Sequence, residues 1–255
     1  MKICIWCKKD ESQNTFNTLA HSIPKSLGGK NICKNVCDKC NNYFGNIQDK
    51  LPSVEETLKE IFYISRVRLL GKENIGKNKA LARIKSTYFN IDVVKSKMSL
   101  KPRFLLEKHF QEKLIRQFKR GIYKIFLEEL EINKNSGLNI DFDFIRNFAK
   151  ENNGNLPVFY FNRINPHIVS CKEWIISPNI CFEFKTMKYL IQNEIFFEFE
   201  LLGHVFGIAI NKDWEIEFEN YLTENIILKK DLFQNMKIIE RVYDIDFTLY
   251  SFDRN

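Results

Sequence analysis

Cys4-Ile5-Trp6-Cys7 and Cys37-Asp38-Lys39-Cys40 are two cysteine pairs with the same two-residue spacing, and they decide the fold of the first fifty residues. Two such pairs can supply the four thiolates of a tetrahedral structural zinc. Cys33 leaves a second choice open, because Cys33 and Cys37 could form the second pair instead. We prefer Cys37 with Cys40, since this spacing repeats the first pair. A site closed by four cysteines has no open position, so this zinc is expected to stabilise the fold and to take no part in a reaction.

A histidine and an asparagine lie inside this zinc frame. His21 is part of Ala20-His21-Ser22-Ile23-Pro24, between the two cysteine pairs, and Asn41 directly follows Cys40. A neutral imidazole can take a proton from water and so make the hydroxide that attacks a phosphodiester. An asparagine carbonyl oxygen is a suitable ligand for the hard divalent cation that such a reaction needs. Asn41 has a second interpretation, as the N-cap of a helix that starts near it.

Together these motifs resemble the HNH endonucleases. The resemblance rests on the two cysteine pairs, on Ala20–Pro24, on Ser26–Gly29 and on the run Asn41–Gly45, in this order and spacing. The HNH endonucleases belong to the His-Me finger (ββα-metal) superfamily, and the variety that this chain resembles has a zinc held by four cysteines. The resemblance covers about a fifth of the chain and implies a β-hairpin followed by a helix, with one catalytic Mg²⁺ or Mn²⁺. It also implies that His21 is the general base and that Asn41 binds the catalytic ion.

One position departs from the family pattern. Many members carry Asp or Glu just before the base histidine, where the carboxylate helps to bind the catalytic ion, but this chain has Ala20. Asp49, about two helical turns after Asn41, is the residue that we expect to compensate, directly or through water. Ala20 therefore keeps an alternative open: a zinc-stabilised module that binds nucleic acid or a partner protein, with a nuclease site that is decayed or gated by that partner.

Charge is distributed unevenly along the chain. The net charge is +7, but residues 66–124 carry 17 Lys and Arg against 4 Asp and Glu, whereas residues 125–255 carry 13 against 21. A basic segment beside a zinc module is what binding to a phosphate backbone needs, although a solvated helix face gives the same pattern. Apolar residues recur every three or four positions from Phe104 to Ile132, which predicts an amphipathic helix with a basic outer surface. The cations expected to bind nucleic acid are Lys108, Lys113, Arg116, Lys119 and Arg120.

The patterns along the chain predict an α+β protein in three parts. We expect a zinc-stabilised ββα-metal module at residues 1–60, a mainly helical basic region at 61–155 and a β-rich accessory region with antiparallel strands at 156–255. Ser53 is predicted to cap a helix over 54–70. The other elements expected are one or two strands within 80–97, a helix at Asp141–Lys150, strands at Val158–Phe161 and Ile180–Phe184, and a hairpin of Glu194–Leu202 with Val205–Ile210 across Gly203.

Composition excludes several classes of protein. With 44% hydrophobic residues and 23 Phe, the chain can bury a proper core and is not disordered. Its apolar runs are too short for a membrane span, and its N-terminus has no signal-peptide pattern. Five of its seven cysteines fall in the first forty residues, which favours metal ligation in a reducing cytoplasm over a disulfide framework.

The hypothesis that follows is a cytoplasmic, metal-dependent HNH endonuclease that hydrolyses phosphodiester bonds of nucleic acid. The resemblance favours double-stranded DNA over RNA, a choice that the residues themselves do not make. The large accessory region resembles that of nucleases in bacterial antiviral defence and restriction systems. Its acidic half is expected to dock a sensor or regulatory protein or a second copy of the chain.

Overall fold

The computed structural model describes residues 1–47, 52–70, 86–92, 97–107, 109–161, 196–216, 218–219, 223 and 236–247. Asp49, Lys108 and the strand expected at Ile180–Phe184 therefore lie outside the described residues.

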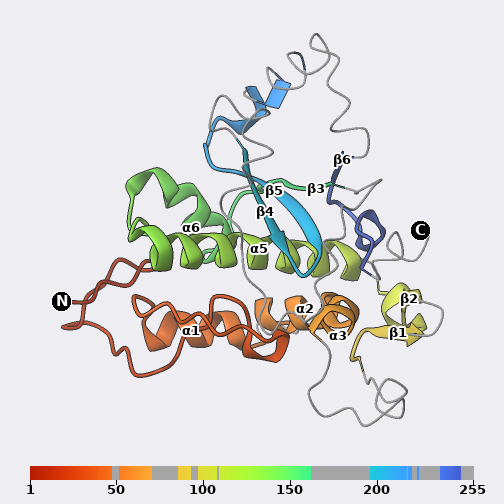
Figure 1. Ribbon diagram of the computed structural model, residues 1–255, viewed down its shortest axis with the longest axis horizontal. Helices are drawn as coiled ribbons and strands as arrows, with labels where there is room; N and C mark the ends of the chain where they lie inside the picture. Colours follow the sequence, from red (N-terminus) through yellow and green to blue (C-terminus); the bar gives the residue numbers. More distant parts are fainter. Residues whose placement is uncertain are drawn as a thin grey trace.

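One long helix, α5 (Phe110–Lys134), runs through the middle of the molecule (Figure 1). Below it in this view lie the N-terminal module with α1 (Asp38–Gly45) and the helices α2 (Val54–Ile61) and α3 (Tyr63–Leu70). Above it lie α6 (Asp143–Ala149) and a β-sheet. Buried side chains from both sides of α5 belong to one hydrophobic cluster, so this helix is the centre of the core.

The sheet has four antiparallel strands in the order β4-β5-β3-β6. Its strands are β3 (Val158–Phe161), β4 (Phe196–Leu201), β5 (His204–Ala209) and β6 (Met236–Ile238). The predicted hairpin across Gly203 is confirmed. Leu202 and Gly203 form its turn with φ values of 50° and 80°, and positive φ at both central residues suits the right-handed twist of the strands.

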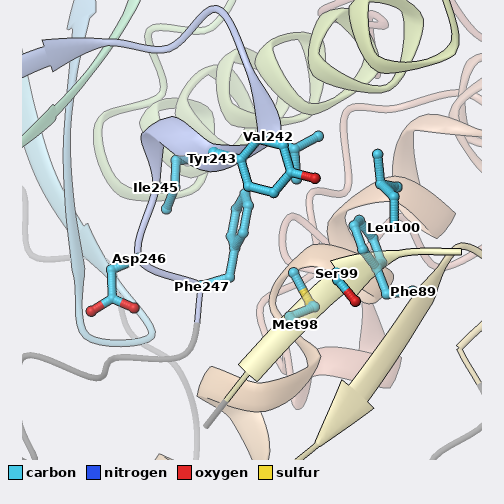
Figure 2. Close-up of a pocket in the computed structure, with 9 residues that line it drawn as sticks. All are labelled: Phe89, Met98, Ser99, Leu100, Val242, Tyr243, Ile245, Asp246 and Phe247. Atoms are coloured by element: carbon cyan, nitrogen blue, oxygen red, sulfur yellow. The ribbon is translucent and has the colours of Figure 1, made fainter. Parts of the chain in front are cut away.

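A second, smaller hairpin precedes α5. It consists of β1 (Phe89–Asp92) and β2 (Lys97–Leu100), so the strand signal predicted within 80–97 is partly confirmed. Between this hairpin and the C-terminal turn η5 (Val242–Asp244) lies a small, largely apolar pocket of about 110 Å³ (Figure 2). Phe89 and Leu100 line one side of this pocket, and Val242 and Phe247 line the other. The pocket therefore lies at the contact between the two segments.

The predicted helix over 54–70 is interrupted. Ser53 caps α2 as predicted, because its hydroxyl accepts a hydrogen bond from the Glu56 amide at 3.0 Å. However, Phe62 leaves the helical conformation (ψ 7°), so α2 ends at Ile61 and α3 begins at Tyr63. The two short helices turn at this point while Phe62 remains fully buried in the core.

The helix predicted from Phe104 to Ile132 is also divided in two. A short helix, α4 (Pro102–Leu105), is followed by His109 with a left-handed φ of 72°, and α5 begins only at Phe110. A positive φ cannot continue a right-handed helix, which explains the break. The helix expected at Asp141–Lys150 is a 3₁₀ turn, η3 (Ile140–Phe142), followed directly by α6.

The predicted basic outer surface is wrong for the middle of α5, because this helix is covered on both sides. The side chains of Lys119 and Arg120 are only 7% and 2% exposed. Buried charged groups need polar partners. Arg120 donates to the carbonyl of Ala149 and the hydroxyl of Tyr43, and Lys119 donates to the side chain of Asn155. In the described part of the chain, no helix is long and apolar enough to cross a membrane.

The crossing of α2 and α5 depends on Gly121. A methyl group at this position would lie 2.7–2.9 Å from the side-chain carbons of Leu58, which is fully buried. Crowding of this kind typically costs about 1–3 kcal/mol and outweighs the helix propensity that alanine adds. We therefore expect Gly121→Ala to lower the free energy of unfolding by about 1–2 kcal/mol in a urea titration.

Gly45 provides a matched control for this substitution. It ends α1, and a methyl group there meets only a carboxylate oxygen of Glu55 at 3.8 Å, which is an ordinary contact. Gly45→Ala should therefore leave the stability unchanged or raise it slightly. Equal losses in the two variants would contradict the tight α2–α5 crossing.

Candidate metal centre and active site

Four cysteine sulfurs of the N-terminal module lie close together. The Sγ atoms of Cys4, Cys7, Cys37 and Cys40 all lie within 4.8 Å of one another, and those of Cys7 and Cys37 are 3.8 Å apart. Tetrahedral zinc with Zn–S bonds of about 2.3 Å places its sulfurs about 3.8 Å apart. The predicted cysteines therefore form a cluster that is compatible with a structural zinc.

Local backbone structure brings the two pairs together. Lys8 has a left-handed φ of 58°, and its amide donates to the carbonyl of Cys4 at 2.8 Å, which closes the first knuckle. Cys37 is the N-cap of α1, and its amide lies 3.4 Å from the sulfur of Cys4. Cys40 follows in the first turn of this helix, so the N-terminus of α1 positions both cysteines of the second pair.

The acid–base properties of the cluster also fit a metal. The hydrogen bond with Cys40 lowers the pKa of the Cys4 thiol to about 5, whereas burial raises the pKa of Cys37 to about 11. Four thiolates in one buried place repel one another, so they ionise together only beside a cation. Zn²⁺ would supply that charge and bind all four sulfurs.

Cys33 is separate from this cluster. It is 2% exposed, and burial raises the pKa of its thiol far above the usual range. The amide of Cys33 donates to the carbonyl of Ala20, so the residue belongs to the hairpin that carries His21. The alternative zinc pair of Cys33 with Cys37 is therefore not the one that the cluster uses.

His21 lies on the first arm of a short antiparallel hairpin. It pairs with Ile32, and the amide of Ser22 donates to the carbonyl of Asn31 at 3.2 Å. The connecting loop contains a single 3₁₀ turn, η1 (Lys25–Leu27). The hairpin is followed by α1, so the order of elements is the β-hairpin and helix that the sequence resemblance implies.

The loop of this hairpin folds tightly onto itself. η1 ends at Gly28, which has a left-handed φ of 90°. At Gly29 a methyl group would lie 1.9 Å from the carbonyl oxygen of Ile23, a distance that no side chain tolerates. The glycine pair therefore gives the loop a shape that other residues cannot adopt.

The ring of His21 is oriented by the backbone. Its Nδ1 lies 3.1 Å from the carbonyl oxygen of Leu19, which can only accept a hydrogen bond. Nδ1 therefore carries a hydrogen, and in the neutral ring Nε2 has the lone pair. The residue is half-buried, so the ring is both held and reachable.

Asn41 lies inside α1 and not at its start. The interpretation of this residue as an N-cap is wrong, because α1 begins at Asp38 and the Asn41 amide already donates to the carbonyl of Cys37. Its side-chain Nδ2 donates to the hydroxyl of Thr18 at 3.1 Å. With the nitrogen fixed on Thr18, the carbonyl oxygen Oδ1 is the end of the side chain that can bind a cation.

Asp38 holds the segment that leads to the hairpin, a role that the sequence analysis missed. Its Oδ1 accepts hydrogen bonds from the amides of Asn17 and Thr18 at 2.8 and 2.7 Å, and from the Thr18 hydroxyl. Hydrogen bonds from the Thr15 and Thr18 side chains lower the pKa of Asp38 to about 2. The signal in the sequence was an acidic residue in the first turn of a helix, followed by Asn41 one turn later.

Two residues of α5 contact the hairpin, and the sequence analysis missed both. The ammonium of Lys124 donates to the carbonyl oxygens of His21 and Ser22 at 2.9 and 3.4 Å. Burial alone would lower the pKa of Lys124, but the carboxylates of Glu128 and Glu55 outweigh it and raise the pKa, so the ammonium stays charged. Five positions further along α5, Glu129 accepts hydrogen bonds from the hairpin as well.

The other cations of α5 serve different contacts. Arg116 is half-buried, and its guanidinium donates to Asn152 and to the carbonyl of Gly154. Lys119 and Arg120 are buried, as described above, and Lys113 is exposed. Of the predicted nucleic-acid contacts in the described residues, Lys113 is thus the one with an exposed side chain.

An open groove of about 770 Å³ lies between the hairpin loop and the start of α2. Among the residues that line it, Lys25 and Lys59 are basic and Glu55 and Glu56 are acidic. This balance means that the groove has no net attraction for a phosphate backbone.

Zinc removal gives a direct test of the cysteine cluster. We expect one zinc ion per purified chain, and Cys4→Ser and Cys40→Ser should lose this metal together with most of the folded N-terminal module. Cys33→Ala should keep one zinc per chain, because Cys33 lies outside the cluster. Metal content measured by mass spectrometry decides this, and loss of zinc from Cys33→Ala would contradict the assignment.

Comparison with known proteins agrees with this geometry. Residues 4–52 match the family described as HNH endonuclease. No curated protein and no solved structure matches the chain significantly. The matched range contains the cysteine cluster, the hairpin with His21 and all of α1 with Asn41. Residues 4–52 of this protein therefore form a domain of the HNH endonuclease family.

Proposed function

We propose that this protein is a metal-dependent endonuclease that cleaves phosphodiester bonds of double-stranded DNA, with His21 as its general base. The family match indicates a nuclease acting on nucleic acid. The observation that supports the finer proposal is the hydrogen bond from His21 to the carbonyl of Leu19, which presents Nε2 as a proton acceptor.

The proposed reaction is the attack of water on phosphorus. His21 Nε2 takes a proton from the water molecule as the oxygen attacks, and the bond to the leaving oxygen breaks in line with it. The side chain of Asn41 supports this site from α1, because Thr18 and Asp38 fix its orientation. Such proton transfer by one positioned group contributes about 10²–10⁴-fold to the rate.

A divalent ion, Mg²⁺ or Mn²⁺, fits this site only in part. When bound, it would stabilise the negative charge that develops on the phosphate and the leaving oxygen. Asn41 Oδ1 offers one oxygen ligand, whereas the side chain of Ala20 is a fully buried methyl group and offers none. We propose Asp49 as a further ligand; it lies outside the described residues.

The lack of a carboxylate at position 20 also favours a second candidate. A zinc-stabilised module with a decayed or partner-gated site would bind nucleic acid or a partner without cutting. The two candidates differ in one property: the nuclease retains a site for a divalent ion beside His21 and Asn41.

The biological setting is part of the proposal. We place the protein in the bacterial cytoplasm, where reducing conditions keep the zinc thiolates intact, and in antiviral defence or restriction. Lys113 and Arg116 are proposed contacts for DNA, and the acidic C-terminal region is proposed to dock a sensor protein or a second copy of the chain. The three-part division at residues 60 and 155 belongs to the same proposal.

Cleavage of supercoiled plasmid tests the nuclease. We expect purified wild-type protein to nick or linearise the plasmid in Mg²⁺ or Mn²⁺ and to be inactive in EDTA. His21→Ala should be slower by about 10²–10⁴-fold, because the proton acceptor is gone. Asn41→Ala should require a higher concentration of the divalent ion for half-maximal rate.

His109→Asn is the matched control for the loss of a histidine. His109 is exposed, pairs with Glu112 and has a left-handed φ that asparagine tolerates, so this variant should cut like the wild type. Equal rates for His21→Ala and wild type would remove His21 from the reaction. Plasmid binding without cleavage at saturating Mn²⁺ would favour the second candidate, and a parallel RNA substrate decides the type of nucleic acid.

A further inference from the structure

The hairpin that carries His21 is held from a helix that lies outside the HNH endonuclease domain. The family match ends at residue 52, whereas Lys124 and Glu129 belong to α5. Both side chains are buried, and both form hydrogen bonds with the hairpin. The domain recognised by sequence is therefore only part of the structure that fixes the orientation of the base.

Lys124 connects three elements of the site at one atom. Its Nζ donates to the carbonyl of His21 at 2.9 Å, lies 3.5 Å from a carboxylate oxygen of Glu55 on α2, and lies 5.7 Å from the ring centre of Phe44 on α1. Its partner within α5 is Glu128, at 2.9 Å, whose other carboxylate oxygen accepts a hydrogen bond from the indole of Trp6 in the first zinc knuckle. The hairpin, α2 and the first cysteine knuckle are thus all connected to the buried ion pair of Lys124 and Glu128.

Glu129 holds both arms of the same hairpin. On the first arm it accepts a hydrogen bond from the hydroxyl of Ser22, directly after His21. On the second arm the side-chain amide of Asn31 lies 3.1 Å from both of its carboxylate oxygens. Lys124 therefore binds the backbone of His21 and Ser22, and Glu129 binds the neighbouring side chains of Ser22 and Asn31. The ring of His21 is in turn bound to the carbonyl of Leu19.

We propose that Lys124 is a positioning residue of the nuclease: from α5 it binds the backbone carbonyl of His21 and so sets the position of the imidazole for proton abstraction. This rests on the nuclease activity proposed above. Its physical basis is the sensitivity of catalysis to geometry, since a displacement of about 1 Å can cost about 10²-fold in rate. The ammonium touches neither substrate nor metal in this role; it acts through the backbone of His21.

Lys124→Met is the first variant of the test. Methionine is one atom shorter than lysine and fills most of the same space, but it removes the hydrogen bonds to His21 and Ser22. We expect kcat for plasmid cleavage to fall about 10–100-fold, with KM for the plasmid and the zinc content unchanged. This variant also leaves Glu128 buried without its cation, so a loss of stability accompanies the loss of rate.

A double variant separates position from stability. Burial already raises the pKa of Glu128 to about 7, so this carboxyl takes up a proton when its cation is removed. In Lys124→Met with Glu128→Gln that cost is gone, and the glutamine oxygen can still accept the hydrogen bond of Trp6. We expect the double variant to recover most of the lost melting temperature but not the lost kcat. Recovery of kcat together with the melting temperature would overturn the proposal, because Lys124 would then act through stability alone.

Tyr123→Phe is the matched control on the same helix. Tyr123 is adjacent and fully buried, but its hydroxyl serves the sheet side: it donates to the carbonyl of Pro157 at 2.7 Å and accepts from the amide of Ala209 at 3.1 Å. This variant should lose stability while kcat stays within about twofold of the wild type. An equal fall of kcat in Tyr123→Phe and Lys124→Met would also overturn the proposal.

Amide hydrogen exchange tests the same contact without cleavage. In Lys124→Met and in the double variant, the amides of Ser22 and Cys33, which pair the two arms, should exchange at least tenfold faster, while the Asn41 amide in α1 stays protected. Unchanged protection of Ser22 and Cys33 would refute the role of Lys124 even if the wild type does not cut DNA. An inactive wild type with faster exchange in the variants would refute the proposed nuclease and leave the structural role of Lys124 supported.

Discussion

The ammonium of Lys124 is a buried charge that contacts the hairpin, α2 and α5 together. A buried ammonium without partners costs several kcal/mol, so the chain must bring acceptors to it from every element nearby. The acceptors are the carbonyls of His21 and Ser22 and the carboxylates of Glu55 and Glu128. The packing of the hairpin, α2 and α5 satisfies all of them at once. The ion pairs of Lys124 with Glu55 and Glu128 thus favour one arrangement of these elements. Apolar packing makes a separate contribution, because it stabilises that arrangement.

The cysteine cluster constrains the same module from its other end. It joins the first knuckle to the start of α1, and Trp6 between the first two cysteines reaches from there to Glu128. The hairpin lies between these two fixed points. Tyr123, next to Lys124, binds the sheet side of the molecule in turn. Neighbouring residues of α5 therefore connect the sheet, through Tyr123, to the hairpin that carries His21, through Lys124.

Sequence-based prediction succeeded where the interacting residues are close in the sequence and failed where they are far apart. The cysteine pairs, the cap at Ser53 and the turn at Gly203 are signals contained within a few positions, and the structure agrees with each. The surface character of α5 was predicted wrongly because its charges were assigned to solvent. Their partners lie far along the chain: Lys124 and His21 are 103 residues apart. No local spacing reveals such a pair, and periodicity alone cannot distinguish a solvated charge from one with a buried partner.

The break at His109 and the start of α1 show a second limit of local patterns. A left-handed histidine has no clear signature in its neighbours, so one helix was expected where there are two. Asn41 suited a cap by residue type, but Cys37 takes that position because the second knuckle folds as the first turn of the helix. At both places the surrounding fold decided between conformations that the residues alone allow.

The separation between His21 and Lys124 has a consequence during synthesis on the ribosome. Chains grow at about 5–20 residues per second, so the 103 residues between the two positions take roughly 5–20 seconds to add. The cysteine pairs and the hairpin emerge first, whereas the carbonyl of His21 has no ammonium to bind until α5 has been made. With the roles proposed above for His21 and Lys124, the growing polypeptide would reach its full cleavage rate only after its central helix has been made.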